Sequence, residues 1–142
     1  MSDKHFVDTN NLMYAHDTAG GAKHKRAKAI VEELWRKRSG VVSTQVLQEL
    51  CFNLRRKTGR PVDLETARNI VADYLAWNVV TNTGEFILEA LDIERQYRVS
   101  FWDALLIQAA EACGADLLYS EDLSDGQTYR GVRVVNPLKP VK

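Results

Sequence analysis

The segment that decides the fold is Phe6-Val7-Asp8-Thr9-Asn10, near the start of the chain. Phe6 and Val7 are the aromatic and β-branched residues of a short buried strand. An Asp-Thr-Asn turn follows, and residues 11–15 (NLMYA) begin a short helix. A buried strand that passes through a polar turn directly into a helix is typical of an α/β fold.

The rest of the chain continues this alternation of short apolar runs with amphipathic helical patterns. Further strands are predicted over residues 41–42, 79–80, 117–119 and 132–135. Further helices are predicted over residues 23–38, 44–54, 63–75, 82–97 and 100–114. The expected caps are Ser43 or Thr44, Asp63, Asn82 (which has capping-box spacing to Glu85) and Ser100. The pattern predicts a single α/β domain over residues 1–142, with a short parallel sheet of about five strands flanked by helices on both faces.

Length and composition are those of a globular domain. The chain has 142 residues, of which 45% are hydrophobic and 27% charged, so it can bury a core of its own. We expect no membrane association and a cytoplasmic location, since no apolar stretch approaches the roughly 18 residues of a membrane span and no secretory leader is evident. Cys51 and Cys113 are expected to be reduced core thiols, and His5, His16 and His24 to be surface residues.

The net charge of zero hides a marked segregation of charges. Residues 23–60 carry eleven Lys and Arg against three acids, whereas residues 61–142 carry seven basic and thirteen acidic residues. The basic segment can form a surface that attracts phosphate groups. Its clusters can equally be solvated helix ends, where the helix dipole favours Lys and Arg.

Four carboxylates are placed unusually for acids. Asp8, Glu49, Asp103 and Asp122 each lie beside an apolar run, at the expected end or inner face of an element, where unpaired acids are rare. In open α/β sheets, ligands bind outside the carboxyl ends of the strands, so these acids can converge there. No Lys or Arg close in sequence pairs with the first three. A shared divalent metal ion is therefore a natural counter-charge.

Each acid also has a purely structural interpretation. Asp8 can cap the helix that follows it, and Asp103 has capping-box spacing to Ser100. Glu49 can be an exposed residue at the edge of an apolar stripe. Asp122 and Asp125 lie in a loop that solubility alone would make acidic.

Four motifs in order resemble those of PIN-domain ribonucleases, and in particular the single-domain VapC-type toxins of bacterial toxin–antitoxin pairs. They are Phe-Val-Asp-Thr-Asn at 6–10, Gln-Glu at 48–49, Phe-Trp-Asp-Ala-Leu-Leu at 101–106 and Tyr-Ser-Glu-Asp-Leu at 119–123. The resemblance runs nearly end to end, to Val-Asn-Pro at 135–137. It implies that the family's four acids are Asp8, Glu49, Asp103 and Asp122, that Asn10 and Ser120 are pocket residues, and that Asp125 is the candidate for a variable fifth acid.

The resemblance implies a metal-dependent endoribonuclease. Asp8, Asp103 and Asp122 would hold Mg²⁺ or Mn²⁺, hard cations that prefer carboxylate oxygens, while Glu49 would orient a water molecule or assist a second ion. The implied partners are an RNA substrate, a cognate antitoxin that lays a helix along an apolar groove, and a second copy of the chain. Trp35, Phe52 and Trp77 are candidate contributors to that homodimer.

Other classes of protein fit less well. A haloacid-dehalogenase-like phosphatase needs a second acid two residues after the first, where this chain has Asn10, and a receiver domain needs an acidic pair that is missing here. The alternative that stays open is a PIN-like module without catalysis, which would use the basic surface over residues 23–60 to bind RNA or protein.

Overall fold

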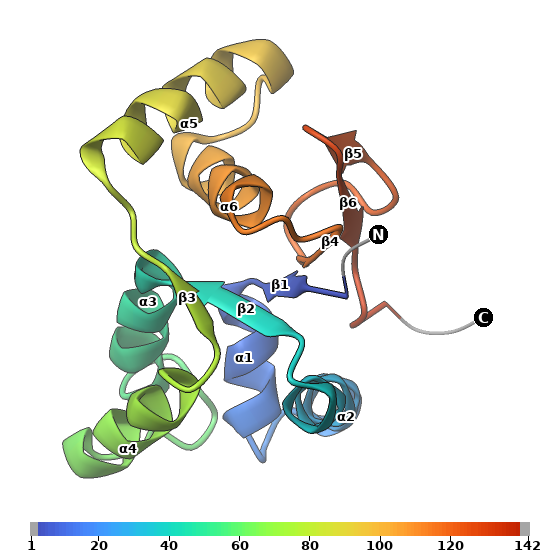
Figure 1. Ribbon diagram of the computed structural model, residues 1–142. Helices are drawn as coiled ribbons and strands as arrows, with labels where there is room; N and C mark the ends of the chain where they lie inside the picture. Colours follow the sequence, from blue (N-terminus) through green and yellow to red (C-terminus); the bar gives the residue numbers. More distant parts are fainter. Residues whose placement is uncertain (1–2, 140–142) are drawn as a thin grey trace.

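A central sheet separates two groups of helices in the computed structural model, which describes residues 3–139 (Figure 1). The helices are α1 (Thr9–His16), α2 (Gly21–Lys37), α3 (Thr44–Leu54), α4 (Leu64–Tyr74), α5 (Gly84–Tyr97) and α6 (Phe101–Ala112). The strands are β1 (His5–Val7), β2 (Gly40–Ser43), β3 (Asn78–Val80), β4 (Leu117–Tyr119), β5 (Thr128–Tyr129) and β6 (Val132–Val135). In Figure 1, α1 to α4 lie below the sheet, and α5 and α6 lie above it.

The strand order is β3-β2-β1-β4-β6-β5, and all neighbouring pairs are parallel except β5 with β6. The predicted α/β class with a mainly parallel sheet is confirmed. The described residues contain one more strand than expected, because β5 has only two residues and no apolar pattern that a sequence window could detect. In register, Val7 of β1 pairs with Tyr119 of β4. The residues that follow these two strands, Asp8 and Ser120, are therefore neighbours.

Helix α5 begins one residue later than its sequence pattern predicts. The residue that caps it is Thr83, whose Oγ1 accepts a hydrogen bond from the Phe86 backbone N–H at 3.2 Å. The backbone N–H of Asn82 instead donates to Thr44 Oγ1 of α3 at 3.3 Å, so this residue ties the chain to a neighbouring helix. The prediction of Asn82 as the cap was wrong, because a contact distant in sequence decides the entry into the helix.

The core lies on both faces of the sheet. Phe6, Val7, Val42 and Leu118 of the central strands are fully buried, which confirms strands covered by helices on either side. Leu50 of α3 is fully buried below the sheet. On the upper side, α6 is buried along a continuous run, residues 104–110.

Several smaller expectations need correction. Cys51 and Cys113 are free thiols, as predicted, but both are only partly buried. His5, His16 and His24, which were expected at the surface, are all partly buried, and His16 Nε2 shares a 2.7 Å hydrogen bond with the Tyr74 hydroxyl. Trp77 packs in the core, 8% exposed, and offers little surface to a second copy. None of the helices within residues 3–139 has the length and apolar character required to cross a membrane.

Gly40, the first residue of β2, is expected to tolerate no side chain. A Cβ there would come within 2.6 Å of the Trp77 ring, which is fixed in the core. We expect Gly40→Ala to lower the free energy of unfolding by about 1–3 kcal/mol, because the Trp77 indole must shift to make room for the added methyl group. Urea denaturation measures this change. Gly84→Ala is the matched control, since a Cβ at Gly84 meets no atom within 4 Å among the described residues. Equal stability of both variants would contradict the packing argument.

Candidate active site

A small cavity lies where the carboxyl ends of the central strands meet α3 and α6. Its volume is about 130 Å³. Asp8 follows β1, and Asp122 follows β4 after a two-residue step. The residues that line the cavity are Asp8, Thr9, Asn10, Gln45, Glu49, Asn53, Trp102, Asp103, Leu106 and Asp122. The four acids that the sequence singles out thus lie around one space, as expected from the position of ligand sites in open α/β sheets.

Asp8 is the most deeply buried of these acids, at 6% exposed. It is the N-cap of α1, and its Oδ1 accepts a hydrogen bond from the Thr9 backbone N–H at 2.6 Å. Its Oδ2 accepts a second hydrogen bond from Ser120 Oγ at 3.2 Å. Burial raises the pKa of the Asp8 carboxyl to about 7, and the nearby charges of Asp122 and Glu49 act in the same direction. The structural role of a cap and a role in the site are therefore combined in one residue.

Ser120 and Asn10 position the acids without contributing charge. Ser120 is fully buried, and besides donating to Asp8 its Oγ accepts from the backbone N–H groups of Asp122 and Leu123, both at 3.3 Å. Asn10 Nδ2 donates to Asp122 Oδ2 at 3.3 Å. Asp8 and Asp122 are thus connected through Ser120 to one hydrogen-bonded turn. Of the two predicted pocket residues, Asn10 lines the cavity, whereas Ser120 is fully buried and is not among the lining residues.

Glu49 and Asp103 approach the cavity from two helices. Glu49 Oε1 accepts a hydrogen bond from Thr9 Oγ1 at 3.5 Å, and Asp103 lies in the first turn of α6, where its backbone N–H donates to Ser100 Oγ at 3.1 Å. Ser100 is the predicted N-cap of this helix, so the capping interaction sets the position of Asp103. Partial burial raises the pKa values of both carboxyls, and the charge of Asp122 contributes to the rise at Asp103.

Asp125 is not brought to this cavity. It is exposed, its Oδ1 accepts from the Asn136 backbone N–H at 2.9 Å, and its Oδ2 pairs with Lys139 Nζ at 3.3 Å. The hydrogen bond from Asn136 and the Lys139 ammonium hold the pKa of Asp125 below its usual range. Through these contacts Asp125 anchors the segment that follows β6, and it does not line the site.

Sequence reasoning missed Gln45, Asn53 and Trp102, all of which line the cavity. Gln45 and Asn53 lie four residues before and four after Glu49, which puts the three side chains on one face of a helix. From the sequence alone, this four-residue spacing around Glu49 could have identified both residues as neighbours of the site. Among the described residues, Gln45 Oε1 is a buried atom without a hydrogen-bond partner. The signal for Trp102 was its position directly before Asp103, within the Phe-Trp-Asp motif at 101–103.

The oxygen atoms around the cavity are the kind of ligand that a hard divalent cation prefers. All four acids offer oxygen atoms, and within residues 3–139 no Lys, Arg or His lines the cavity to neutralise them. Asp8, with its raised pKa, has the electrostatics expected of a carboxylate that lacks a counter-ion. In the described part of the chain, however, no three Asp, Glu, His or Cys side chains are grouped closely enough to hold a metal ion as they stand.

A model of the PIN domain family matches residues 5–124, which contain all four acids and most of the sheet. The chain belongs to the PIN domain family. This confirms the resemblance noted in the sequence, with its motifs at the ends of β1 and β4 and on α3 and α6. A search of curated proteins gave no match for the chain.

Solved structures of PIN-domain toxins share the fold. VapC20 of Mycobacterium tuberculosis, described as a sarcin-ricin loop cleaving toxin, superposes with a TM-score of 0.64 at 25% identity, over 84% of this chain and 90% of that one. A toxin–antitoxin complex from Klebsiella pneumoniae gives a TM-score of 0.69 at 16% identity, over 94% and 98%. The DNA-bound VapBC of Salmonella typhimurium gives 0.65 at 16% identity, over 94% and 97%. The structural neighbours of this PIN domain thus include a VapC toxin, a toxin–antitoxin complex and a VapBC complex.

Proposed function

We propose that this PIN domain is a Mg²⁺-dependent endoribonuclease and the toxin of a toxin–antitoxin pair. The observation that carries the proposal is the cavity at the carboxyl edge of the sheet, lined by Asp8, Glu49, Asp103 and Asp122 and by no basic residue within residues 3–139. A cluster of acids that repel one another destabilises a fold, so such clusters are typical of functional sites. Membership of a family of nucleases indicates what that function is.

Asp8, Asp103 and Asp122 are the proposed ligands of the cation. When bound, Mg²⁺ or Mn²⁺ would neutralise charge on a scissile phosphate and lower the pKa of a water molecule. Ser120 and Asn10 hold two of the three carboxylates in place through their hydrogen bonds to Asp8 and Asp122. Glu49, which accepts a hydrogen bond from Thr9 of the neighbouring helix α1, orients the attacking water and accepts its proton at a carboxylate oxygen.

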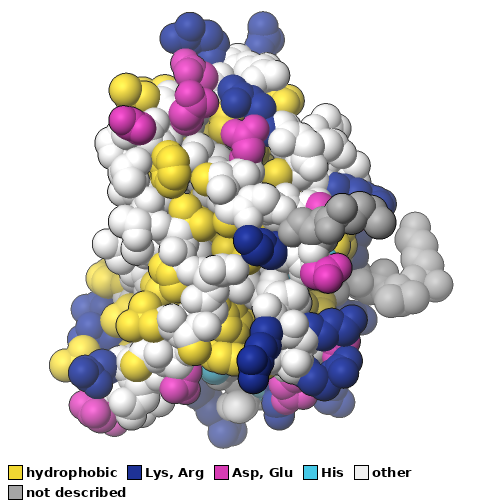
Figure 2. Space-filling model, viewed as in Figure 1, with side chains coloured by type: hydrophobic (Ala, Val, Ile, Leu, Met, Phe, Trp, Pro, Cys, Tyr) yellow, Lys and Arg dark blue, Asp and Glu magenta, His cyan; other side chains and the backbone are white. Residues whose placement is uncertain are grey.

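The basic cluster at the end of α3 supports RNA as the substrate. Lys57 is close enough to lower the pKa of Glu49, in opposition to the effect of burial. The segment that contains Arg55, Arg56 and Lys57 therefore adjoins the acidic cavity. A strand of RNA can bind its flanking phosphates there while one phosphate enters the cavity. Figure 2 also shows Lys and Arg side chains over the lower part of the molecule, where α2 lies.

The proposed partners follow from the neighbouring structures. Two of these are complexes of a toxin with its antitoxin. An apolar groove suitable for a helix lies between α3 and α4, lined by residues that include Leu47, Phe52 and Leu75. Phe52 and Trp35 keep enough exposed surface, 53% and 37%, to contribute to a homodimer. We place the toxin in the cytoplasm, where its RNA target would be.

The test is a cleavage assay on structured RNA. We expect the protein to cleave RNA with added Mg²⁺ or Mn²⁺, to lose this activity with EDTA, and to regain it when the metal is restored. Mg²⁺ is also expected to raise the Tm of the protein, because a ligand that binds only the folded state stabilises it. This second measurement detects the cation independently of catalysis.

The same assay separates the enzyme from a binding module. A protein that binds RNA but leaves it intact with every metal would be the non-catalytic alternative. Cleavage that persists in EDTA would show that the acids do not act through a cation. Growth arrest on expression, relieved by the product of the neighbouring reading frame, would test the toxin–antitoxin assignment.

A further inference from the structure

Trp102 is a large aromatic residue left in solvent at the edge of the cavity. Its side chain is 64% exposed, although it lies in the first turn of α6, a helix whose following residues 104–110 are all buried. It lines the same cavity as the four acids and directly precedes Asp103. The residue thus combines strong exposure with a position beside the proposed scissile phosphate.

The fold gains little from this side chain. Its ring contact within residues 3–139 is with Phe101, whose centroid lies 5.3 Å away at an interplanar angle of 72°. Phe101 is partly buried and packs against the core, so its edge-to-face contact orients the indole while the rest of the indole stays open. An oriented, accessible indole is ready to stack on a flat partner.

The surroundings of Trp102 favour a nucleotide over an apolar helix. Apart from Trp102 itself, the cavity lining in the described part of the chain contains one apolar residue, Leu106, which is buried. The other members carry carboxyl, amide or hydroxyl groups. A single aromatic plane among hydrogen-bonding groups suits a ligand with a flat base and a polar backbone.

We propose that Trp102 is the stacking platform for a nucleobase next to the scissile phosphate. It follows that the substrate is unpaired at the cut, since a base within a duplex cannot lie on a protein side chain. Trp102 therefore helps select single-stranded segments or loops. This inference rests on the proposed function, because it takes RNA as the ligand of the cavity.

The test measures binding and cleavage separately. Binding of a mixed-sequence single-stranded RNA of about 12 nucleotides is followed in EDTA by tryptophan fluorescence. The quenching by RNA is expected in the wild type and absent in Trp102→Phe, which retains only the indoles of Trp35 and Trp77. A duplex of the same sequence is expected to give no Trp102 signal.

In cleavage, Trp102→Ala is expected to raise the KM for this oligonucleotide by about 5- to 150-fold, the range of base–aromatic stacking. Trp102→Phe keeps an aromatic face and is expected to recover most of the loss. Leu88→Ala is the matched control, because Leu88 on α5 is equally exposed at 64% and does not line the cavity. Its KM should equal that of the wild type.

The outcomes distinguish this inference from the proposed function. A wild type that cleaves RNA, together with a Trp102→Ala variant of unchanged KM and unchanged preference for single strands, would overturn the stacking role alone. Loss in Trp102→Phe as large as in Trp102→Ala would also overturn it. Quenching at Trp102 in a protein that never cleaves RNA would support stacking and refute the nuclease.

Discussion

Asp8→Asn is expected to lower the rate of Mg²⁺-dependent RNA cleavage by at least about 100-fold. The substitution removes one negative charge from the centre of the proposed cation site, where Asp8 is buried and held by Thr9 and Ser120. Asn keeps the size of the side chain and can still accept the hydrogen bond from the Thr9 backbone. The loss therefore reports the charge and not a collapse of the site.

The measurement is the initial rate of cleavage at saturating Mg²⁺, with circular dichroism to show that the variant is folded. Asp103→Asn is expected to give a comparable loss, since Asp103 faces the same cavity. Asp92→Asn is the control, an equally conservative change at an exposed position on α5 outside the cavity. Cleavage by Asp8→Asn at the wild-type rate would refute the metal-carboxylate mechanism.

Asp8→Asn is also expected to stabilise the metal-free protein at pH 8. The folded-state pKa of Asp8 is raised from 3.8 to about 7, chiefly by burial. Between these values the folded protein holds a proton that the unfolded chain has released, so stability falls as the pH rises through this interval. The raised pKa corresponds to a cost of about 4 kcal/mol above pH 7. Asn removes that cost because it does not ionise.

Thermal or urea unfolding in EDTA across pH 4 to 8 measures the effect. The gain should reach about 2–4 kcal/mol at pH 8, shrink as the pH falls toward 4, and raise Tm by roughly 2–4 °C per kcal/mol. Mg²⁺ should stabilise the wild type but not the variant. A gain that is the same at every pH would show that ionisation of Asp8 is not its source. Asp92→Asn should show no change at any pH.

These two predictions describe one trade-off. Burial of Asp8 makes its charge costly in the metal-free fold and leaves it without a cationic side chain as a partner in the described cavity. Because no basic side chain neutralises this charge in the described cavity, it is available to bind a cation. The metal-free fold is less stable because the proposed chemistry needs a buried negative charge at Asp8.

Local patterns predicted most elements because a strand or a cap depends on residues a few positions apart. Ser43, Asp63 and Ser100 cap their helices as expected, each by accepting from a backbone N–H three residues later. The prediction failed at Asn82, where Thr44 from another helix takes the backbone N–H. It also missed β5, which exists only through its pairing with β6.

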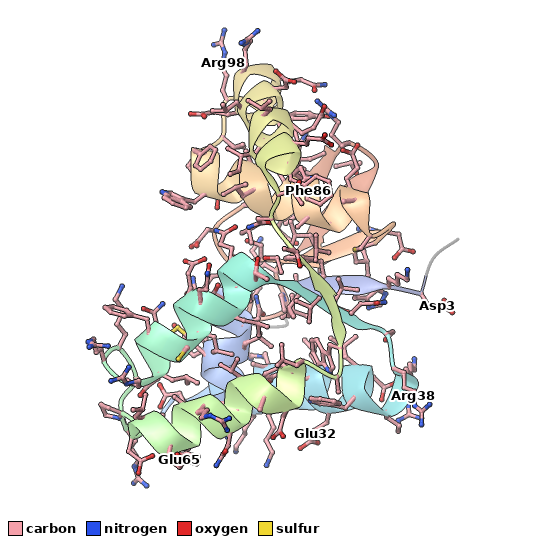
Figure 3. The ribbon with its side chains drawn as sticks, turned by 60° about the vertical axis from the view of Figure 1, so that its left-hand side comes forward. Asp3, Glu32, Arg38, Glu65, Phe86 and Arg98 are labelled. Carbon is pink, nitrogen blue, oxygen red and sulfur yellow. The ribbon has the colours of Figure 1, made fainter. Side chains whose placement is uncertain are left out.

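In the candidate site, too, local motifs predicted some features and tertiary contacts decided others. The motifs identified Asp8, Glu49, Asp103 and Asp122, and the structure brings them to one cavity. Asp125 lies in the same acidic loop as Asp122, yet its contacts with Asn136 and Lys139 hold it away from the cavity. The cavity is lined by residues of α3 and of α6, two helices that lie on opposite sides of the sheet (Figure 3).

By itself, then, the sequence determined the alternation of strands and helices, the family and the four acids, because these are written in short motifs and periodicities. Only the tertiary structure decided which residues meet. The strand order places β1 beside β4, so that Ser120 donates to Asp8 across 112 positions of sequence. Packing of helices on both faces then buries Asp8 and leaves Trp102 exposed. Strand order and burial depend on the whole fold, which no short segment of sequence encodes.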